Sequence, residues 1–290
     1  MHPVLADLLR LLELERLEED IFRGESRDLG GPRVFGGQVL GQSLTAATYT
    51  VDGRDVHSLH AYFLRAGDVK APIIYEVDRS RDGKSFSNRR VVAIQHGRPI
   101  FSMTASFQRW EAGLEHQANM PDVPAPAALE SMTEIQKNVL ERFPEKMRRF
   151  LTQQRPFEIR PVEPIDLISM EPREAKRHVW IRSLDQLPGD PDLHRNLLAY
   201  VSDYQLVGTT ILPHAVGFAG SNVQMASLDH AMWFHRPFRV DEWLLYTMES
   251  PNASGARGLA LGRFFNIDGV LVASTAQEGL VRIWQERDHS

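Results

Sequence analysis

The chain has 290 residues, of which 42% are hydrophobic and 24% are charged, and its formal net charge is −5 at pH 7. This length favours about two domain-sized units, with enough apolar material for a buried core. The negative charge argues against a nucleic-acid-binding surface, and the absence of cysteine excludes disulfides, thiolate metal sites and cysteine nucleophiles.

The sequence shows no sign of insertion into a membrane or of secretion. No stretch has the roughly 18 continuous apolar residues of a membrane-spanning helix. The first ten residues carry charges within their apolar pattern, unlike the core of a signal peptide. Together with the lack of cysteine, which favours a reducing compartment, these features predict a cytoplasmic protein that does not act at a membrane.

The first part of the chain predicts two helices and a series of strands. Leucines at three- and four-residue spacing predict an amphipathic helix over 3–18, followed by a strand-like segment over 20–26. The uncharged run 35–51 predicts a helix that is enclosed by protein, because it has no polar face. Further strands are predicted over 57–64, 73–79, 85–95 and 100–108, with a turn at Gly97-Arg98-Pro99 before the last.

Residues 109–160 break this pattern, and after them the earlier order returns. Prolines lead into a charged amphipathic helix predicted over 127–153. A second enclosed helix is predicted over 193–207. Strands are predicted over 157–161 and 178–183, from residues near 224, 243 and 258, and over 270–282.

Short sequence echoes relate the two halves. His60-Ala61-Tyr62-Phe63-Leu64-Arg65 returns as His230-Ala231-Met232-Trp233-Phe234-His235-Arg236, and Ile73-Ile74-Tyr75 as Leu244-Leu245-Tyr246. Gly97 through Ser102-Met103-Thr104-Ala105 matches Gly269 through Ser274-Thr275-Ala276-Gln277. The offset stays between 170 and 172, which indicates an internal duplication.

A long apolar helix with antiparallel strands, present twice, predicts an α+β fold of the double hot-dog type. In this fold two curved antiparallel sheets each wrap around a long central helix, and we expect them to join edge to edge. The predicted organisation is an N-terminal hot-dog over 1–110, a connector with an amphipathic helix over 111–156, and a C-terminal hot-dog over 157–290.

One carboxylate stands out in the second enclosed helix. Asp203 is the only Asp, Glu, Lys or Arg in residues 196–228, where the average composition predicts about 8. On a helix its neighbours three and four residues away are apolar or aromatic: Ala199, Tyr200, Leu206 and Val207. Burying an unpaired charge is costly, so such a group shifts its pKa or gains hydrogen-bond donors, as general bases do.

Several common catalytic motifs are missing. Gly41-Gln42-Ser43-Leu44-Thr45 lacks the second glycine of a nucleophile elbow. Gly83-Lys84-Ser85 is similar to the end of a phosphate-binding loop, but Asp78 occupies the place of the opening glycine. A hairpin turn at Asp82-Gly83 is the favoured interpretation. We expect neither a metal nor another cofactor.

Long strings of residues carry a resemblance to a known family. They are Phe35-Gly36-Gly37-Gln38-Val39-Leu40-Gly41-Gln42, His60-Ala61-Tyr62-Phe63-Leu64-Arg65, Arg81-Asp82-Gly83-Lys84-Ser85-Phe86-Ser87, Met103-Thr104-Ala105-Ser106-Phe107-Gln108, Asp229-His230-Ala231-Met232-Trp233-Phe234-His235-Arg236-Pro237-Phe238 and Asp268-Gly269-Val270-Leu271-Val272-Ala273-Ser274-Thr275-Ala276-Gln277-Glu278-Gly279. From about residue 5 to residue 284, the chain resembles the acyl-CoA thioesterase II group of double hot-dog enzymes.

The resemblance implies a catalytic set. Its members are an Asp on the second enclosed helix, a Thr or Ser just ahead of the Asp-His pair, and a Gln in the last strand. By position these are Asp203, Ser227 and Gln277, all in the C-terminal hot-dog. Many relatives have Thr at the position of Ser227. The hydroxyl is retained here, but without the methyl group its χ1 angle is less restricted, so we expect weaker preorganisation.

The resemblance also implies a reaction. A medium- to long-chain fatty acyl-CoA is hydrolysed to free fatty acid and coenzyme A by a base-activated water, with no covalent acyl-enzyme. Asp203 accepts the proton of the water while Ser227 and Gln277 orient it.

The implied binding partners are the acyl-CoA substrate and further copies of the chain. Arg65, Arg79, Arg81 and Lys84 are candidates for contacts with the coenzyme A phosphates, although a solvated charge is the simpler interpretation of each. Members of the family commonly form dimers or tetramers of double hot-dogs, so we expect a homo-oligomer. We expect no nucleic acid partner.

Two other functions stay open. A hot-dog enoyl-CoA hydratase or dehydratase needs an acid–base pair. Asp229-His230 is the candidate pair, although successive strand residues point to opposite faces. A non-catalytic acyl-CoA-binding protein keeps a pocket without turnover. The retention of all three polar groups speaks against it.

Overall fold

The structure is a computed structural model, and it describes residues 1–28, 33–142, 145, 148, 152–164, 171–214, 216 and 223–284. Its helices include α1 (Pro3–Leu12), α2 (Gly36–Thr48), α3 (Met132–Val139) and α5 (Pro191–Ser202), with 3-10 segments η1 (Pro126–Ala128), η2 (Leu140–Arg142) and η3 (Val207–His214). The strands of the first part are β1 (Glu15–Glu18), β2 (Ile21–Gly24), β3 (Asp55–Phe63), β4 (Ile73–Asp82), β5 (Phe86–Gln95) and β6 (Arg98–Gln108). Those of the second part are β7 (Phe157–Pro161), β8 (Lys176–Ser183), β9 (Val223–Ser227), β10 (Asp229–Phe234), β11 (Leu244–Ser254), β12 (Arg257–Asn266) and β13 (Leu271–Ile283).

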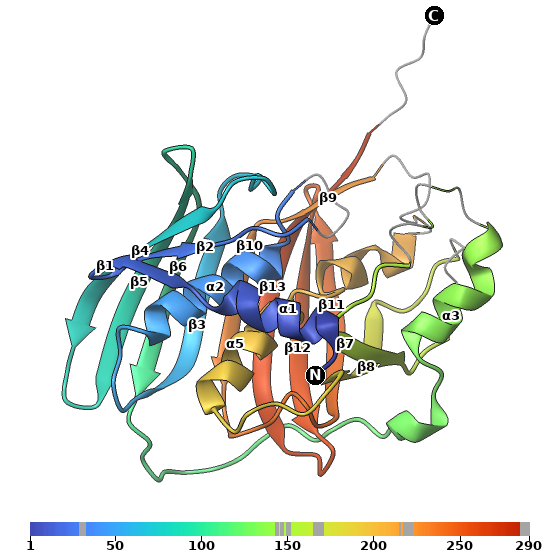
Figure 1. The fold of residues 1–290 in the computed structure, drawn as a ribbon. Coiled ribbons are helices and arrows are strands. Elements are labelled where there is room, and N and C mark those ends of the chain that lie inside the picture. Colours follow the sequence, from blue (N-terminus) through green and yellow to red (C-terminus); the bar gives the residue numbers. More distant parts are fainter. Residues whose placement is uncertain are drawn as a thin grey trace, which may run out of the picture.

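The strands form one large antiparallel sheet. Its order is β1-β2-β4-β5-β6-β3-β10-β13-β12-β11-β8-β7, and β9 pairs with β13. Figure 1 shows α1, α2 and α5 lying against this sheet. An α+β architecture built on an antiparallel sheet is therefore confirmed.

The two halves of the sheet meet at one strand pair. β3 of the first half pairs with β10 of the second, with His60 opposite Ala231 and Ala61 opposite His230. The expectation that the two sets of strands join edge to edge is confirmed. Hydrogen bonds between the halves leave neither β3 nor β10 as an open edge, which protects both from pairing with other chains.

Helix α2 is enclosed, as its uncharged sequence predicts. It packs against β3, β4, β5 and β6 on one side and against α1 and α5 on the other (Figure 1). Glycine allows the backbones of α2 and α5 to approach closely, since a Cβ at Gly37 would lie 2.1 Å from Tyr200 O. The buried Gln42 is satisfied because its Nε2 donates to Leu11 O at 2.6 Å and its Oε1 accepts from the Tyr75 hydroxyl at 2.7 Å.

Two predicted helices end earlier than expected. The helix predicted over 3–18 ends at Leu12, because Glu15–Glu18 forms β1, which pairs with β2 and places Glu15 in an ion pair with Arg23 at 2.6 Å. The helix predicted over 193–207 ends at Ser202.

Asp203 is therefore the C-cap of α5 and does not lie on a helical face. The chain turns through Gln205, whose φ is +63°. The expectation that Leu206 and Val207 flank Asp203 on one face of a helix was wrong.

Two further boundaries differ. The turn predicted at Gly97-Arg98-Pro99 lies at His96 and Gly97, whose φ angles are +50° and +70°, so both central residues adopt the left-handed conformation of a tight hairpin. The helix predicted over 127–153 begins only at Met132, where Ser131 and Glu134 form a capping box. Residues 143–144, 146–147 and 149–151 of that predicted helix lie outside the described residues.

Among the residues that the structure describes, no helix is both long enough and apolar enough to cross a membrane.

The contact between α2 and α5 makes a testable prediction. Replacing Gly37 with Ala places a methyl group against the backbone carbonyl of Tyr200, which cannot yield as a flexible side chain does. We expect Gly37→Ala to lower the free energy of unfolding by about 1–3 kcal/mol or more, measured by denaturant unfolding. The control is Gly113→Ala, because a Cβ at Gly113 has no heavy atom within 4 Å. Equal stability of the two variants would contradict the close packing of the helices.

Candidate functional site

The Asp203 carboxylate lies where the two halves of the chain meet. Its Oδ2 accepts a hydrogen bond from Gly37 N at 2.9 Å, and its Oδ1 accepts one from Gln277 Nε2 at 2.7 Å. Among the described residues, neither Lys nor Arg forms an ion pair with it. The charge is therefore stabilised by hydrogen bonds from neutral donors.

The N-terminus of α2 supplies one of these donors. Gly37 is in the first turn of α2, where backbone N–H groups have no partner within the helix and carry partial positive charge. A Cβ on the preceding residue, Gly36, would lie 2.8 Å from Asp203 Oδ2. Sequence reasoning did not assign these glycines to the site. The sequence feature that could have identified them is a glycine pair at the start of an enclosed helix.

Gln277 comes from β13 and its side chain is fully buried. Its Nε2 is used by Asp203, while its Oε1 is buried and has no hydrogen-bond partner among the described residues. A buried acceptor of this kind is costly unless a further molecule supplies a donor. The site therefore contains one acceptor that is ready for an O–H or N–H group.

Ser227 completes the predicted set at the end of β9. Its Oγ lies 3.5 Å from Asp203 Oδ1, at the outer limit of a hydrogen bond. Strand β9 pairs with β13 and places Ser227 opposite Gly279, two residues from Gln277. The structure thus brings together Asp203, Ser227 and Gln277, the three residues that the family resemblance implies.

The surroundings change the acidity of Asp203. Burial raises its pKa from 3.8 to about 6, although the hydrogen bonds from Gln277, Gly37 and Ser227 act in the opposite direction. Desolvation is the larger effect on the pKa, because it penalises the charged form more than the three neutral donors stabilise it. A carboxylate with this pKa is ionised at neutral pH and still accepts a proton readily.

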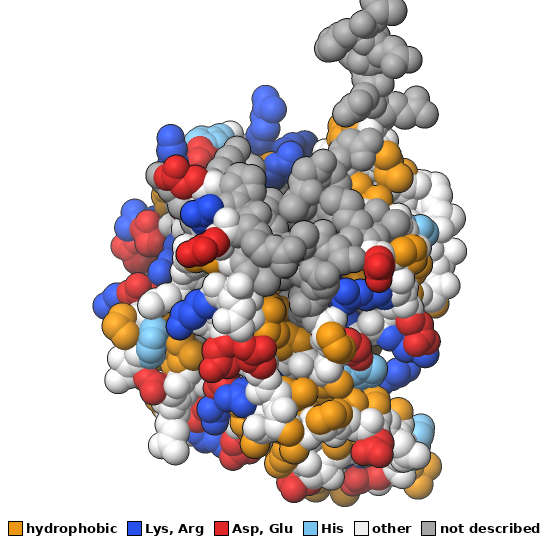
Figure 2. Space-filling view, turned by 90° about the vertical axis from the view of Figure 1, so that its right-hand side faces the viewer, with side chains coloured by type: hydrophobic (Ala, Val, Ile, Leu, Met, Phe, Trp, Pro, Cys, Tyr) orange, Lys and Arg blue, Asp and Glu red, His pale blue; other side chains and the backbone are white. Residues whose placement is uncertain are grey.

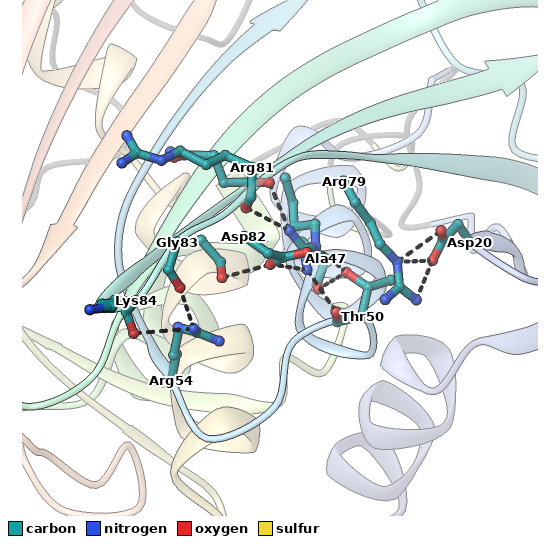
Figure 3. Close-up of polar contacts among 12 residues, drawn as sticks. Asp20, Ala47, Thr50, Arg54, Arg79, Arg81, Asp82, Gly83 and Lys84 are labelled. Carbon is teal, nitrogen blue, oxygen red and sulfur yellow. Dashed lines mark hydrogen bonds and ion pairs between the residues drawn. The ribbon is translucent and has the colours of Figure 1, made fainter.

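The basic residues proposed for the coenzyme A phosphates differ in their contacts. Figure 3 shows Arg79, Arg81 and Lys84 around Ala47 and Thr50, at the C-terminal end of α2 and not at the end that contacts Asp203. The Arg79 guanidinium binds the Asp20 carboxylate at 2.9–3.0 Å.

Arg65 follows β3, and its Nη1 donates to Pro99 O, in β6, at 2.6 Å. The side chains of Arg81 and Lys84 form neither a hydrogen bond nor an ion pair with another described residue. These two are the members of the predicted set whose charges are free to meet a ligand.

The Asp229-His230 pair is not arranged as an acid–base couple. Asp229 Oδ1 accepts from Glu278 N at 2.6 Å, whereas His230 is fully buried with its Nε2 3.0 Å from Ser202 Oγ. Burial lowers the pKa of His230 to about 3, so its imidazole is neutral. The described residues also contain no cluster of three or more His, Asp or Glu side chains that would hold a metal ion.

Comparisons with known proteins agree over most of the chain. Residues 149–280 match the sequence profile of the acyl-CoA thioesterase family, and residues 25–108 match that of the acyl-CoA thioesterase N-terminal domain. Human acyl-coenzyme A thioesterase 8 is 46% identical over 286 residues, which cover 94% of this chain and 88% of that protein.

Solved structures show the same likeness. The crystal structure of an acyl-CoA thioesterase II, TesB2, from Mycobacterium marinum is 44% identical, with a TM-score of 0.78 and coverage of 96% of this chain and 99% of that one. A protein with a hot-dog fold from Alicyclobacillus acidocaldarius is 20% identical, with a TM-score of 0.77 and coverage of 96% and 99%, and supports the fold alone. By its sequence and its fold, the chain belongs to the acyl-CoA thioesterase family.

Proposed function

We propose that this chain hydrolyses medium- to long-chain fatty acyl-CoA to free fatty acid and coenzyme A, with Asp203, Ser227 and Gln277 as catalytic residues. The observation that carries the proposal is the Asp203 carboxylate, which has a raised pKa and accepts a hydrogen bond from Gln277 at 2.7 Å. Membership of the acyl-CoA thioesterase family supplies the class of substrate.

In the proposed reaction Asp203 acts as general base. A water between the three side chains gives a proton to the carboxylate as its oxygen attacks the thioester carbonyl carbon. The carbon–sulfur bond then breaks, and the proton passes from Asp203 to the sulfur of coenzyme A. The acid retains the oxygen of the water, and the enzyme forms no covalent bond to the acyl group.

The unpaired oxygen of Gln277 supports a position for this water. Gln277 Oε1 is an acceptor without a partner among the described residues, so it suits the second O–H of a water that gives its first proton to Asp203. Ser227 Oγ, 3.5 Å from Asp203 Oδ1, adds a hydroxyl close enough to contact the same water. Held by three groups, the water is oriented before the substrate arrives.

Aromatic side chains near Asp203 support an apolar acyl group as the substrate. A Cβ on Gly36 would lie 3.0 Å from the Phe63 ring as well as near Asp203. Phe35, which precedes Gly36, contacts Tyr200 and Tyr204 with ring centroids 5.2 and 5.3 Å apart. We infer that a medium- or long-chain acyl group gains more from this surface than a short one does, because it buries more apolar area. The rate of thiol release across acyl-CoA lengths tests this.

The double hot-dog is part of the proposal. One hot-dog over 1–110 contains α2 and the strands β3 to β6, and the other, over 157–290, contains α5 and the candidate site. Residues 111–156 connect them. The closeness of α2 to its four strands and the sequence echoes between the halves support this division.

Cytoplasmic location and assembly into a homo-oligomer complete the proposal. On the face shown in Figure 2, acidic and basic side chains are interspersed, which is not the pattern of a nucleic-acid-binding surface. Trp110, at the end of the first hot-dog, and Leu114, in the connector, are 80% and 104% exposed, and exposed apolar side chains of this size suit a contact between copies. A single-chain mass in light scattering would contradict the oligomer.

The alternatives have less support. For a hydratase or dehydratase, His230 would need to reach the substrate, but it is fully buried and bonded to Ser202. A non-catalytic acyl-CoA-binding protein has no need of a carboxylate with a raised pKa between an amide and a hydroxyl.

Removing the base gives the most direct prediction for the reaction. We expect Asp203→Asn to lower kcat for release of thiol from a fatty acyl-CoA by about 10²- to 10⁴-fold, because Asn cannot accept the proton. Circular dichroism shows whether the variant is folded. The control is Asp229→Asn, which keeps the oxygen that accepts from Glu278 N and is expected to retain wild-type turnover. Full turnover by Asp203→Asn, or its loss in Asp229→Asn, would contradict the assignment.

The raised pKa predicts the pH dependence. Since the base acts only when ionised, kcat/KM is expected to rise about tenfold per pH unit below pH 6 and to level off above it, following the pKa of about 6. Initial rates from pH 5 to 8 measure this profile. A rate that falls as the pH rises through 6, or that does not change, is inconsistent with Asp203 as the base.

A further inference from the structure

The end of α5 that carries Asp203 is held by a tyrosine. Ser202 is the last residue of α5, and its carbonyl is among those that have no partner within the helix. The Tyr246 hydroxyl, from β11, donates its hydrogen to Ser202 O at 2.8 Å. Burial and the nearby Asp203 carboxylate raise the pKa of Tyr246, so the phenol keeps its proton and remains a donor.

The side chain of Ser202 is held as well. Its Oγ donates to Ala199 O at 2.8 Å and lies 3.0 Å from His230 Nε2. Because the single hydroxyl hydrogen of Ser202 is directed to Ala199, His230 Nε2 is the donor in the second contact. Both the backbone and the side chain of the residue before Asp203 are therefore fixed.

Tyr246 also contacts the strand that carries Gln277. Thr275 Oγ1 lies 3.1 Å from the Tyr246 hydroxyl oxygen and is the donor, since the tyrosine hydrogen is given to Ser202. Thr275 and Gln277 are two residues apart on β13, so they lie on the same face, and both are buried. A Cβ at Gly262 would lie 2.4 Å from Thr275 Oγ1, so glycine keeps this contact open.

We propose that Tyr246 is a positioning residue for the reaction: its hydroxyl fixes the end of α5 relative to β13, so that Asp203 stays within hydrogen-bonding distance of Gln277. This inference rests on the proposed function, because Tyr246 acts through Asp203. A base moved by even a fraction of an ångström transfers protons poorly, whereas binding of the acyl and coenzyme A parts is not affected. Loss of the hydroxyl therefore lowers kcat and leaves KM unchanged.

The duplication in the sequence supplies a matched control. Tyr75 occupies the position in the first half that Tyr246 occupies in the second, and its ring is fully buried too. Its hydroxyl donates to Gln42 Oε1 at 2.7 Å. Gln42 is in the middle of α2, away from Asp203, so Tyr75→Phe removes a comparable buried hydroxyl without touching the helix end at the site.

The experiment compares Tyr246→Phe with Tyr75→Phe by thermal unfolding and by steady-state thiol release. Both variants are expected to be less stable than the wild type, because each removes a hydrogen bond to a buried acceptor. We expect Tyr246→Phe to lower kcat about tenfold at unchanged KM, and Tyr75→Phe to retain wild-type kcat. If Tyr246→Phe does not fold, Thr275→Val tests the inference in its place. It removes the second hydroxyl of the chain of hydrogen bonds, and we expect it to lower kcat several-fold.

The results distinguish the role of Asp203 as general base from the role of Tyr246 as positioning residue. If Asp203→Asn is inactive but Tyr246→Phe and Thr275→Val both have the kcat of Tyr75→Phe, the positioning role is overturned and the base stands. If Asp203→Asn keeps wild-type turnover, the proposed function fails first and the inference about Tyr246 fails with it. A selective loss of kcat in Tyr246→Phe supports the inference.

Discussion

The contact between the N-terminus of α2 and the C-terminus of α5 determines the rest of the candidate site. Gly37 N donates to the Asp203 carboxylate at 2.9 Å, and a Cβ on the same glycine would lie 2.1 Å from Tyr200 O. One backbone approach thus brings the two helix ends together and gives the carboxylate a hydrogen-bond donor. Because the donors are neutral, the carboxylate retains a raised pKa instead of being held as the partner of a cation. A base suited to neutral pH results from this arrangement.

The two halves of the chain differ at positions that the sequence echoes equate. His60 pairs with Ala231 and Ala61 with His230, so the β3–β10 junction is symmetric under the sequence echo that equates 60 with 230. A second echo, with an offset of 172, equates Gln277 with Ala105. The residues paired with these two on the neighbouring strands also differ.

The partner of Gln277 is Ala260, whereas the partner of Ala105 is Arg89. The buried Arg89 guanidinium donates to Thr50 O at 3.0 Å and to Asp82 at 2.8 Å, beside the hairpin shown in Figure 3. In the first half, the Arg89–Asp82 ion pair therefore lies next to the strand position that corresponds to Gln277.

Much of this arrangement was visible in the sequence. The isolated charge of Asp203, the uncharged helix that became α2 and the offset between the halves are properties of local composition, which sequence shows directly. The approach of Gly37 and the network of Tyr246, Ser202 and Thr275 depend on contacts between residues 29 to 166 positions apart in the sequence. No periodicity reports such contacts. The exact end of α5 was also missed, since a helix and the 3-10 turn after it have the same apolar character.

The central claim is that Asp203 activates a water and does not itself attack the thioester. A single turnover with enzyme in excess, in water enriched in the heavy oxygen isotope, tests it most directly. The account predicts one heavy oxygen in the released fatty acid and none in the peptide that contains Asp203, both read by mass spectrometry. Heavy oxygen in the Asp203 carboxylate after that turnover would show an acyl-enzyme anhydride and would contradict the account.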